Sequence, residues 1–454
     1  MALEDSGLMR EVESVMLLGS TRQSLQWRCR IYAGDDVVIP LKVLSLDIVR
    51  DYTGAYADRI MLQIALGAGA YNHRLYPNRD ALKVEVYCQV VAGNEEGSIV
   101  NVMGTYRGLL INLSSQSIES NTSTAQSEYA EDISNIMTLD MQLADETLES
   151  IRLQTVGGIF QNVTPAQVLR QLLTRCSQQI SMDTDTRVSG VEMIAPDNSE
   201  VRRQIVVPHG TPLVDLADFL QVERGGIYAS GIGCYLLNRI WYVFPEFNLK
   251  RFDTTPRTLT VINLPANRMA QIENTYRRTS NQVIILATAE TRQQDESERR
   301  LTERGNGVRY ADARQVIKGM STTQGNRTTF KRGESNSEYV AFTRPGGKTN
   351  APMSKQRITD NPFVQTSALA NRKGSLVQIK WENAEVDLLY PGMPVRFVYT
   401  QNNRIEETYG VLHGEHYFIH DPQPGLAPRG HLCNAALTFF LDNDIDWDEA
   451  TVTA

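Results

Sequence analysis

Hydrophobic and polar positions alternate most clearly between Val38 and Val91. Apolar residues occupy every second position from Ile60 to Leu66, and again from Leu82 to Val90 with Lys, Glu, Tyr and Gln between them. Alternation with a period of two predicts strands of a sheet that has one buried face and one wetter face. This pattern favours a protein that builds a wall or a tube over a protein with a deep catalytic cleft.

Two later segments have the pattern of helices. Thr164 and Pro165 predict a helix start, because threonine can cap a helix and proline suits its first position. A second helix is predicted to start at Thr211-Pro212 and to end at Gly225-Gly226, since glycine tolerates the left-handed cap. Their predicted inner faces are Val168, Leu169, Leu172, Leu173 and Cys176 in the first helix, and Leu213, Leu216, Ala217 and Leu220 in the second.

Further strands are predicted after the second helix, whereas residues 128–155 mix acids and apolar residues in a weakly helical pattern. From Glu290 to about residue 378 the chain is polar and lacks periodicity, which is typical of a functional excursion rather than of a core. The strands are predicted at 227–235, 239–244, 258–264, 282–287, 376–381, 394–399, 407–412 and 433–441.

Composition indicates a packed protein made in a reducing compartment. Of 454 residues, 41% are hydrophobic and 22% are charged, and this length suits several domains of roughly 100–200 residues each. The five cysteines are scattered and odd in number, which argues against a disulfide framework or a zinc module. No apolar run approaches the ~18 residues that span a bilayer, and acids stand where a signal peptide needs positive charge. We therefore expect no membrane insertion and no signal peptide.

Charge is unevenly distributed along the chain. Residues 291–380 hold 17 Lys and Arg against 8 Asp and Glu, whereas residues 381–454 hold 3 against 12. The basic band indicates either a partner surface of defined sign or a solvated loop. Its few aromatic residues do not interleave for base stacking, and the chain's net charge of −8 opposes general affinity for DNA phosphates. A contact with another protein is the better prediction for the band.

Three histidines, His413, His416 and His420, lie close together with Glu415 among them. Imidazoles and carboxylates are zinc ligands. The segment, however, alternates like a strand, which predicts His416 and His420 on one face and His413 on the other. The spacing that makes zinc motifs credible is also missing. The sequence therefore favours an ordinary strand here over a metal site.

Other candidate motifs lack the context that their chemistry needs. Aspartates at alternate positions from Asp442 to Asp448 resemble the opening of a calcium loop, but Trp447 and Thr453 stand where that loop needs glycine and glutamate. The glycine-rich segment 225–233 follows a helix instead of leading into one, so it does not predict a phosphate loop. No G-x-S-x-G nucleophile motif occurs. We predict no catalytic, cofactor-binding or metal-binding residues, and a protein that is not an enzyme.

Several segments together resemble a known family of viral proteins. They resemble the central baseplate hub protein of contractile-tailed bacteriophages, from its opening barrel through a mid-chain segment to the start of its second barrel. The resemblance covers about residues 30–290, with a weaker likeness at 380–445. The segments are Leu46–Tyr52, Tyr56–Ile60, Tyr71–Leu82, Gly225–Gly231, Trp241–Pro245, Arg251-Phe252 and Glu273–Arg278.

The resemblance implies a homotrimer in which each subunit carries two similar tube-type β-barrels. Six barrels would then form a ring that continues the sixfold tail tube on one side and holds the threefold central spike on the other. Its implied partners are itself, tail tube proteins, the central spike protein and other baseplate proteins. Viral DNA would pass through the lumen without specific binding. The implied location is the virion, after assembly in the host cytoplasm, and no cofactor is implied.

The predicted fold class is α+β and mainly β, with two tube-type β-barrel domains plus an inserted small α+β domain. Two alternatives remain: a tail-associated cell-wall hydrolase that depends on an Asp or Glu, and a DNA-contacting protein that uses residues 291–380. The predicted domains are a first barrel at 1–115, the inserted domain at 116–205, a helix and strands that link or complete the barrels at 206–260, a second barrel at 261–445 that contains the basic excursion 291–380, and an acidic tail at 446–454.

Overall fold

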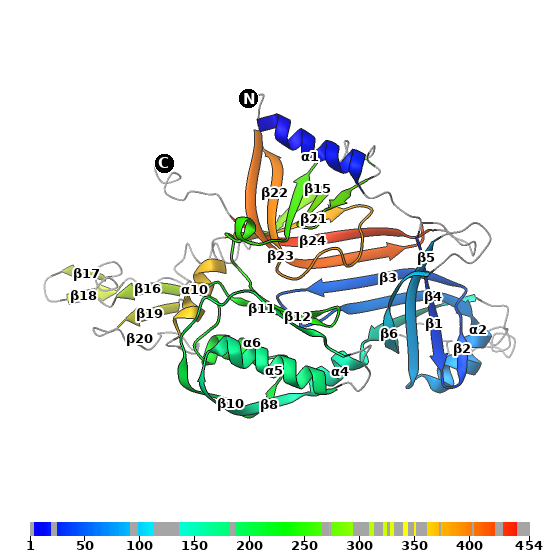
Figure 1. The fold of residues 1–454 in the computed structure, drawn as a ribbon, viewed down its shortest axis with the longest axis horizontal. Coiled ribbons are helices and arrows are strands. Elements are labelled where there is room, and N and C mark those ends of the chain that lie inside the picture. The colour runs from blue at the N-terminus through cyan, green and yellow to red at the C-terminus, as the bar shows by residue number, and fades with distance from the viewer. Residues whose placement is uncertain are drawn as a thin grey trace.

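The structure is a computed structural model in which two β-barrels lie one above the other, with an α+β region beside the lower one (Figure 1). The predicted acidic tail at 446–454 lies outside the described residues. The described residues are 4–19, 25–90, 99–111, 136–180, 187–265, 272, 274–293, 308–312, 321–324, 327–330, 339–343, 349–350, 361–371, 374–401, 404–422 and 430–442.

The first barrel contains the strands with the clearest alternation. Its strands are hydrogen-bonded in the order β2-β1-β5-β6-β7-β4-β3. Ile60, Leu62 and Ile64 are at most 3% exposed, as the alternation predicts, and Cys88 is buried among them as a small apolar residue. The strands are β1 (Leu25–Ala33), β2 (Asp36–Val38), β3 (Lys42–Asp51), β4 (Arg59–Gly67), β5 (Leu82–Val90), β6 (Ile99–Ile111) and β7 (Ile136–Ala144).

A short helical connection joins β4 to β5. It consists of α2 (Ala68–Ala70), the π-helical turn η1 (Tyr71–Leu75) and the 3-10 helix η2 (Tyr76–Asn78). Proline within η2 occupies one of its first positions, where a missing N–H costs nothing. The chain therefore turns between these strands in helical form.

The second barrel is closed by its own hydrogen bonds. Its strands follow the order β23-β22-β13-β15-β21-β24, and β24 pairs back onto β23. Helix α1 (Glu4–Leu18) crosses its outer face, where Val15 packs with Ile284 and Val398. The strands are β13 (Thr258–Asn263), β14 (Tyr276–Arg278), which pairs with β15, β15 (Gln282–Gln293), β21 (Gly374–Trp381), β22 (Pro394–Gln401), β23 (Arg404–His420) and β24 (Leu432–Asp442).

Both barrels use the same strand order. Taking the six main strands of each barrel in chain order, the first pairs with the fourth, the fourth with the fifth, and the fifth with the sixth. The sixth then pairs with the third, and the third with the second, in both barrels. One difference is direction, because β13 runs parallel to β22 whereas β1 runs antiparallel to β5. The predicted fold class, mainly β with barrels and an α+β region, is confirmed.

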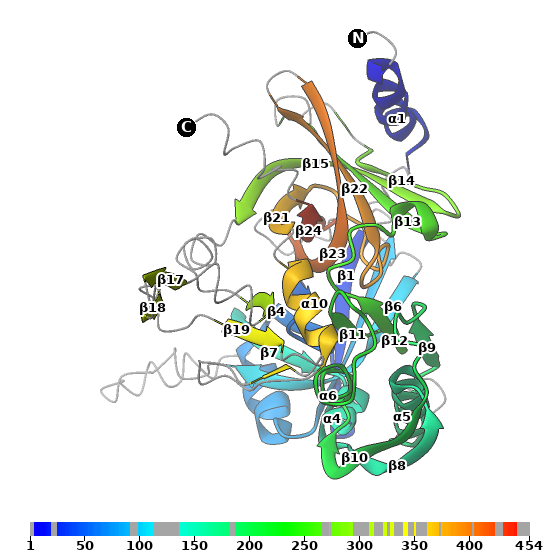
Figure 2. The same ribbon diagram turned by 90° about the vertical axis from the view of Figure 1, so that its left-hand side faces the viewer.

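The α+β region has a hydrophobic core of its own. The buried residues of that core run from Ile151 to Trp241 and Val243. In Figure 2 its helices lie over the strand pair β8–β10 at the foot of the molecule. The elements are α4 (Glu146–Leu153), β8 (Thr155–Val163), α5 (Pro165–Ile180), β9 (Gly190–Met193), β10 (Arg202–Pro212), α6 (Leu216–Glu223), β11 (Ile232–Leu237) and β12 (Ile240–Pro245), followed by the 3-10 turn η4 (Phe252–Thr254).

The first predicted helix begins where the sequence indicates, but the second does not. Thr164 Oγ1 accepts from the Gln167 N–H at 3.2 Å, and Gln167 returns a bond to the Thr164 N–H at 2.9 Å, which is a capping box at the start of α5. The start predicted for the second helix at Thr211-Pro212 is wrong. Those residues end strand β10, and α6 begins at Leu216. Its apolar face and its glycine-rich end are as predicted.

The predicted domain ranges cut across these cores. Strand β7 lies in the range 116–205 but pairs with β4 and β6 of the first barrel. Elements from the range 206–260, including α6, share the core of α5. The stretch 128–155, predicted as weakly helical, contains β7 before it contains α4.

Most of the basic excursion 291–380 lies outside the described residues. Its end, α10 (Pro362–Asn371), packs against α6 (Figure 2). The Asn361 side chain donates to the carbonyls of Gln221 and Val222 at 2.5 and 3.0 Å and caps α10 by accepting from the Phe363 N–H. The excursion thus returns to the α+β region. Its described strands are β16 (Val308–Asp312), β17 (Ser321–Gln324), β18 (Arg327–Phe330), β19 (Tyr339–Thr343) and β20 (Thr349–Asn350).

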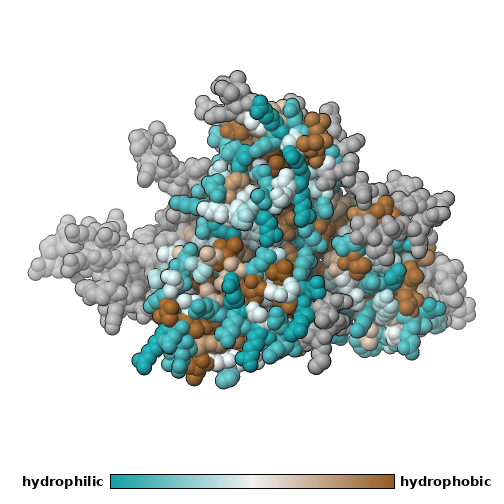
Figure 3. All heavy atoms as spheres, in the orientation of Figure 1, coloured by the Kyte–Doolittle hydropathy of each residue, from teal (hydrophilic) through white to brown (hydrophobic). Residues whose placement is uncertain are grey.

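The outer surface is mixed in polarity. Figure 3 shows apolar residues in separate patches over this face, one of them at the end of α1, where Leu17 is 80% and Leu18 66% exposed. Within the described part of the chain, none of the helices has the length and apolar character needed to cross a membrane.

Candidate functional site at the junction of the barrels

A single strand pair joins the two barrels into one sheet. Residues 45–51 of β3 pair antiparallel with residues 414–420 of β23, in the register Ser45 to His420 and Asp51 to Gly414. The ladder continues into the corner after β3, where the Tyr52 N–H donates to the His413 carbonyl at 2.9 Å. Hydrogen bonds and one continuous apolar core therefore fix the barrels against each other.

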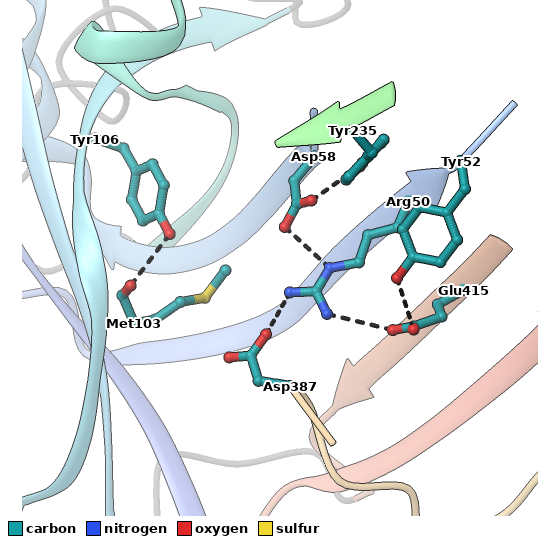
Figure 4. Close-up of polar contacts among 8 residues, drawn as sticks. All are labelled: Arg50, Tyr52, Asp58, Met103, Tyr106, Tyr235, Asp387 and Glu415. Carbon is teal, nitrogen blue, oxygen red and sulfur yellow. Dashed lines mark hydrogen bonds and ion pairs between the residues drawn. The ribbon is translucent and has the colours of Figure 1, made fainter. Parts of the chain in front are cut away.

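One arginine gathers three carboxylates at this junction (Figure 4). Arg50 Nε lies 3.0 Å from Asp58, Nη2 lies 2.5 Å from Asp387, and Nη1 lies 3.3 Å from Glu415. The Tyr52 hydroxyl donates to the other Glu415 oxygen at 2.6 Å. Two of the carboxylates come from the second half of the chain, so the network spans the joint between the barrels.

Burial makes these charges depend on each other. The side chains of Arg50 and Glu415 are 2% and 0% exposed. Burial raises the pKa of Glu415, and Arg50 and the Tyr52 hydroxyl offset that only in part. Burial alone would lower the pKa of Arg50, but Asp58 and Glu415 raise it well above its ordinary value. Arg50 therefore stays charged and is the cation on which the buried Glu415 carboxylate relies.

The α+β region is tied into the same network. The Tyr235 hydroxyl, on β11, donates to the second oxygen of Asp58 at 2.9 Å. Its ring meets that of Tyr52 edge-on, with centroids 4.8 Å apart. Both tyrosines are at most 1% exposed, and satisfied buried networks of this kind hold their elements in one geometry. The three parts of the molecule therefore meet at Arg50.

A buried histidine bridges the seam of the first barrel. Its end strands β1 and β3 form no ladder among the described residues, but His431 joins them. Its Nδ1 accepts from the Trp27 N–H at 3.2 Å, so Nε2–H donates to the Val43 carbonyl at 2.9 Å. Burial lowers the pKa of His431, which favours this neutral form.

Replacing His431 with alanine should open the seam. The Trp27 N–H and the Val43 carbonyl would lose a partner in a buried place, and we expect the free energy of unfolding in urea to fall by about 2–3 kcal/mol. Amide exchange in β1 should also accelerate. His420→Ala, at a half-buried position on β23, is the control. Equal losses for the two variants would show that the seam does not depend on His431.

The three clustered histidines lie on a strand, as predicted, and alternating burial puts His416 and His420 on one face, as predicted, but the opposite face predicted for His413 is wrong. A bulge interrupts β23 between Leu412 and Gly414, so His413 and His416 line the same cavity. His413 donates from Nε2 to the Glu246 carbonyl at 2.9 Å and stacks on Phe440, whereas His416 contacts Asp47 at 2.5 Å. Among the described residues, no group of three His, Cys, Asp or Glu side chains is placed to hold a metal.

The cavity beside the junction holds a half-buried acid. It has a volume of about 520 Å³, and Glu246, His413 and Phe440 line it. Burial, then Asp218 and Asp51, raise the pKa of Glu246 to about 8. Burial lowers the pKa of His413 to about 4. Both side chains are therefore neutral near pH 7, so the cavity holds polar groups without charge.

Glu246→Gln should stabilise the protein above neutral pH. The unfolded chain loses the Glu246 proton from about pH 4.5 upward, while the folded chain keeps it to about pH 8. Stability therefore falls as pH rises through this window and levels off above it. We expect the variant to gain about 1–2 kcal/mol over the wild type between pH 5 and pH 8, after allowance for solvent screening.

Urea unfolding at several pH values measures this difference. Exposed Glu406→Gln on β23 is the matched control, and its difference from the wild type should vary less with pH. A Glu246→Gln curve that runs parallel to the wild-type curve would show that this carboxyl is ionised in the folded protein at neutral pH.

Comparisons with solved structures find phage tail proteins. A tail protein from Neisseria meningitidis MC58 is 12% identical, over 93% of this chain and 98% of its own, with a TM-score of 0.43. The 43 kDa tail protein of prophage MuSo2 from Shewanella oneidensis is 10% identical, over 90% and 96%, with a TM-score of 0.45. These neighbours are tail proteins.

An Escherichia coli component of the type VI secretion system, described as similar to tail proteins of bacteriophage T4, is 9% identical over 88% of this chain and 74% of its own, with a TM-score of 0.39. No protein-family model and no curated protein sequence matches the chain. The neighbours belong to the class of protein that the sequence resemblance predicts. At these scores the likeness carries no functional argument by itself.

Sequence reasoning found part of this site. The corner at Arg50-Asp51-Tyr52 belongs to a segment that carries the family resemblance, but its partners were not predicted. Glu415 was weighed only as a zinc ligand, and Asp387 was not singled out. The signal for this network would have been a buried cation opposite an inward-facing acid on a neighbouring strand. That signal can be read only when the pairing of β3 with β23 is known.

Proposed function

We propose that this chain is a structural hub protein of a contractile phage tail. Three copies form a ring of six barrels that joins the sixfold tail tube to the threefold central spike. The observation that carries the proposal is the duplication: two barrels of one strand order lie side by side in one sheet within one chain. A threefold assembly of such subunits presents six similar units, which is the geometry that a tube-to-spike adaptor needs.

The junction network suits that mechanical role. An adaptor keeps its two barrels in one relative orientation while neighbouring proteins exert force on the ring. Arg50 binds carboxylates from both barrels, and Tyr235 adds the α+β region. Buried networks in which every member has a partner favour one arrangement over alternatives. This supports the use of the subunit as a rigid double unit.

The same network supports a protein that is not an enzyme. A cell-wall hydrolase that cleaves glycosidic bonds needs a pair of carboxyl groups flanking its substrate in a cleft. Asp58, Asp387 and Glu415 do come together, but each binds the Arg50 guanidinium. Carboxylates held in this way are placed to fix structure. The proposed partners are a second and third copy, tail tube proteins, the central spike and other baseplate proteins.

Viral DNA is proposed to cross the ring without specific binding. A net charge of −8 repels phosphates, which supports passage rather than adhesion. The proposed location is the virion baseplate, after assembly in the host cytoplasm. The basic excursion within residues 291–380 is proposed to contact neighbouring baseplate proteins.

Light scattering of the purified protein, with class averages from electron microscopy, tests the proposal. We expect the mass of a trimer and a ring with a central hole. A stable monomer of closed shape would contradict the hub. Release of peptidoglycan fragments that disappears in Glu415→Gln would favour the hydrolase instead. Salt-sensitive duplex binding that is lost on deletion of residues 294–360 would favour the DNA-contacting protein.

A further inference from the structure

A second pocket lies where the α+β region meets the connection between β21 and β22. It has a volume of about 370 Å³, and pockets of about 300–1,000 Å³ hold small organic ligands. Val191 and Met193 of β9 and Tyr242 of β12 line it together with Tyr390-Pro391 from that connection. It shares no lining residue with the cavity beside the junction, so it is a separate site.

Arg251 lines this pocket and is a buried cation without an acidic partner. It is only 6% exposed, and its Nη1 donates to the Gly392 carbonyl at 2.9 Å. Its Nη2 is also buried, and within the described part of the chain it has no hydrogen-bond partner. Burial lowers the pKa of Arg251, and Tyr390 and Tyr228 offset this only in part. At Arg50 burial acts in the same direction, but neighbouring carboxylates raise the pKa well above its ordinary value.

A buried guanidinium of this kind favours an anionic ligand. A water molecule would satisfy an N–H of Nη2, but it would leave the buried charge without a counter-charge. A carboxylate supplies both a hydrogen-bond acceptor and the opposite charge. Because the Arg251 guanidinium is shielded from bulk water, solvent weakens its attraction for a nearby anion less than it would at the surface.

The other charges around the pocket set the charge of that ligand. Arg257 also lines the pocket, but it pairs with Glu192 at 3.2 Å, and both side chains are about half exposed, at 52% and 50%. Arg170, on α5, is exposed at the same pocket. Exposed charges are screened by water and ions. One negative charge therefore balances the one buried cation, Arg251.

The remaining lining favours a ligand with a flat apolar body. The rings of Tyr242 and Tyr390 are stacked, with centroids 6.1 Å apart and planes 26° apart. Met193 and Phe244 add further apolar surface. The Tyr390 hydroxyl already donates to the Arg257 carbonyl at 2.6 Å. An inorganic ion would leave these apolar walls in contact with water, whereas an organic ligand would cover them.

We propose that this pocket binds an organic monocarboxylate with a flat apolar body, whose charge Arg251 balances. The carboxylate belongs either to a free small molecule or to an acidic side chain of a docked protein, and both present the same chemistry. The proposal goes beyond the hub function and does not depend on it.

Calorimetric titration of the purified full-length chain tests the ligand class. Benzoate is the probe, benzamide is a control of the same shape without the charge, and inorganic phosphate is a control for general attraction of anions. We expect benzoate to bind at least about tenfold more tightly than either control. Equal binding of benzamide would overturn the role of the carboxylate. Equal binding of phosphate would overturn the organic ligand.

Two variants place the probe in this pocket. Arg251→Met should weaken benzoate binding about tenfold, because the buried counter-charge is lost. Arg203→Met, the same substitution at an exposed position on β10 outside the pocket, should leave the affinity unchanged. If Arg251→Met fails to fold, Tyr242→Leu decides the matter, because it removes a stacked ring from the wall and should also weaken benzoate. Unchanged affinity in a folded Arg251→Met or Tyr242→Leu variant would overturn the site.

An acetylated and amidated Phe-Glu-Phe peptide, whose single charge is a side-chain carboxylate, separates the two sources. Tighter binding of the peptide than of benzoate supports the site with a docked protein as its source, and weaker binding supports it with a small molecule. Light scattering keeps the proposed function apart from this result. A trimeric ring that does not bind benzoate would overturn the pocket and leave the hub intact, whereas a monomer that binds benzoate would do the reverse.

Discussion

Replacing Arg50 with methionine should lower the free energy of unfolding by about 3–5 kcal/mol. Methionine fills a similar volume but leaves the carboxylates of Asp58, Asp387 and Glu415 without their shared cation. Leaving the Glu415 carboxylate without a cation costs the most, because its side chain is fully buried. Urea unfolding at neutral pH measures this loss of unfolding free energy. Most of the loss comes from carboxylates left without a cation, and less from the contacts that the Arg50 side chain makes.

Arg59→Met is the matched control, since Arg59 is exposed on β4 and the substitution is the same. It should change stability by no more than about 0.5 kcal/mol. Adding Glu415→Gln to Arg50→Met should recover part of the loss, because one stranded charge is removed. The two changes would then be non-additive, as expected for residues in one network. Similar losses for Arg50→Met and Arg59→Met would show that Arg50 does not hold the junction.

Local pattern was sufficient to predict most of the strands. A half-buried strand has a period of two whatever it pairs with, so Ile60 to Leu66 and Leu82 to Val90 could be assigned from sequence alone. The capping box at Thr164 and the glycines after α6 are equally local. Strand β7 was missed although its pattern is also local, because Met137, Leu139, Met141 and Leu143 alternate with polar residues. Its pairing is not local, since its partners β4 and β6 lie earlier in the chain.

The junction was beyond prediction for the same reason. Arg50 and Glu415 are 365 residues apart, and neither has a neighbour in sequence that indicates its role. His413 was placed on the wrong face because a single bulged residue shifts the alternation, and periodicity cannot reveal a bulge. The duplication of the barrels was predicted through the family resemblance and not from local pattern, and the two barrels share strand order although β1 and β13 run in different directions relative to their partners.

Replacing Trp381 with alanine should be as damaging as the loss of Arg50, and should also abolish the proposed ring. Trp381 is fully buried in the second barrel, where its Nε1–H donates to Thr275 at 3.1 Å. Truncating a buried tryptophan costs about 3–5 kcal/mol. The barrel that carries both β15 and β23 would lose its packing, so light scattering should show the trimer dissociating at protein concentrations where the wild type is intact.

Trp241→Ala is the informative comparison because it makes the same truncation in the other core. Trp241 is also fully buried, and its Nε1–H donates to Ser177 at 2.9 Å within the α+β region. Its cost in unfolding energy should be similar, yet both barrels would keep their packing, and the ring should persist. If both variants dissociate the ring equally, the α+β region takes part in assembly, and the barrels alone do not form the ring.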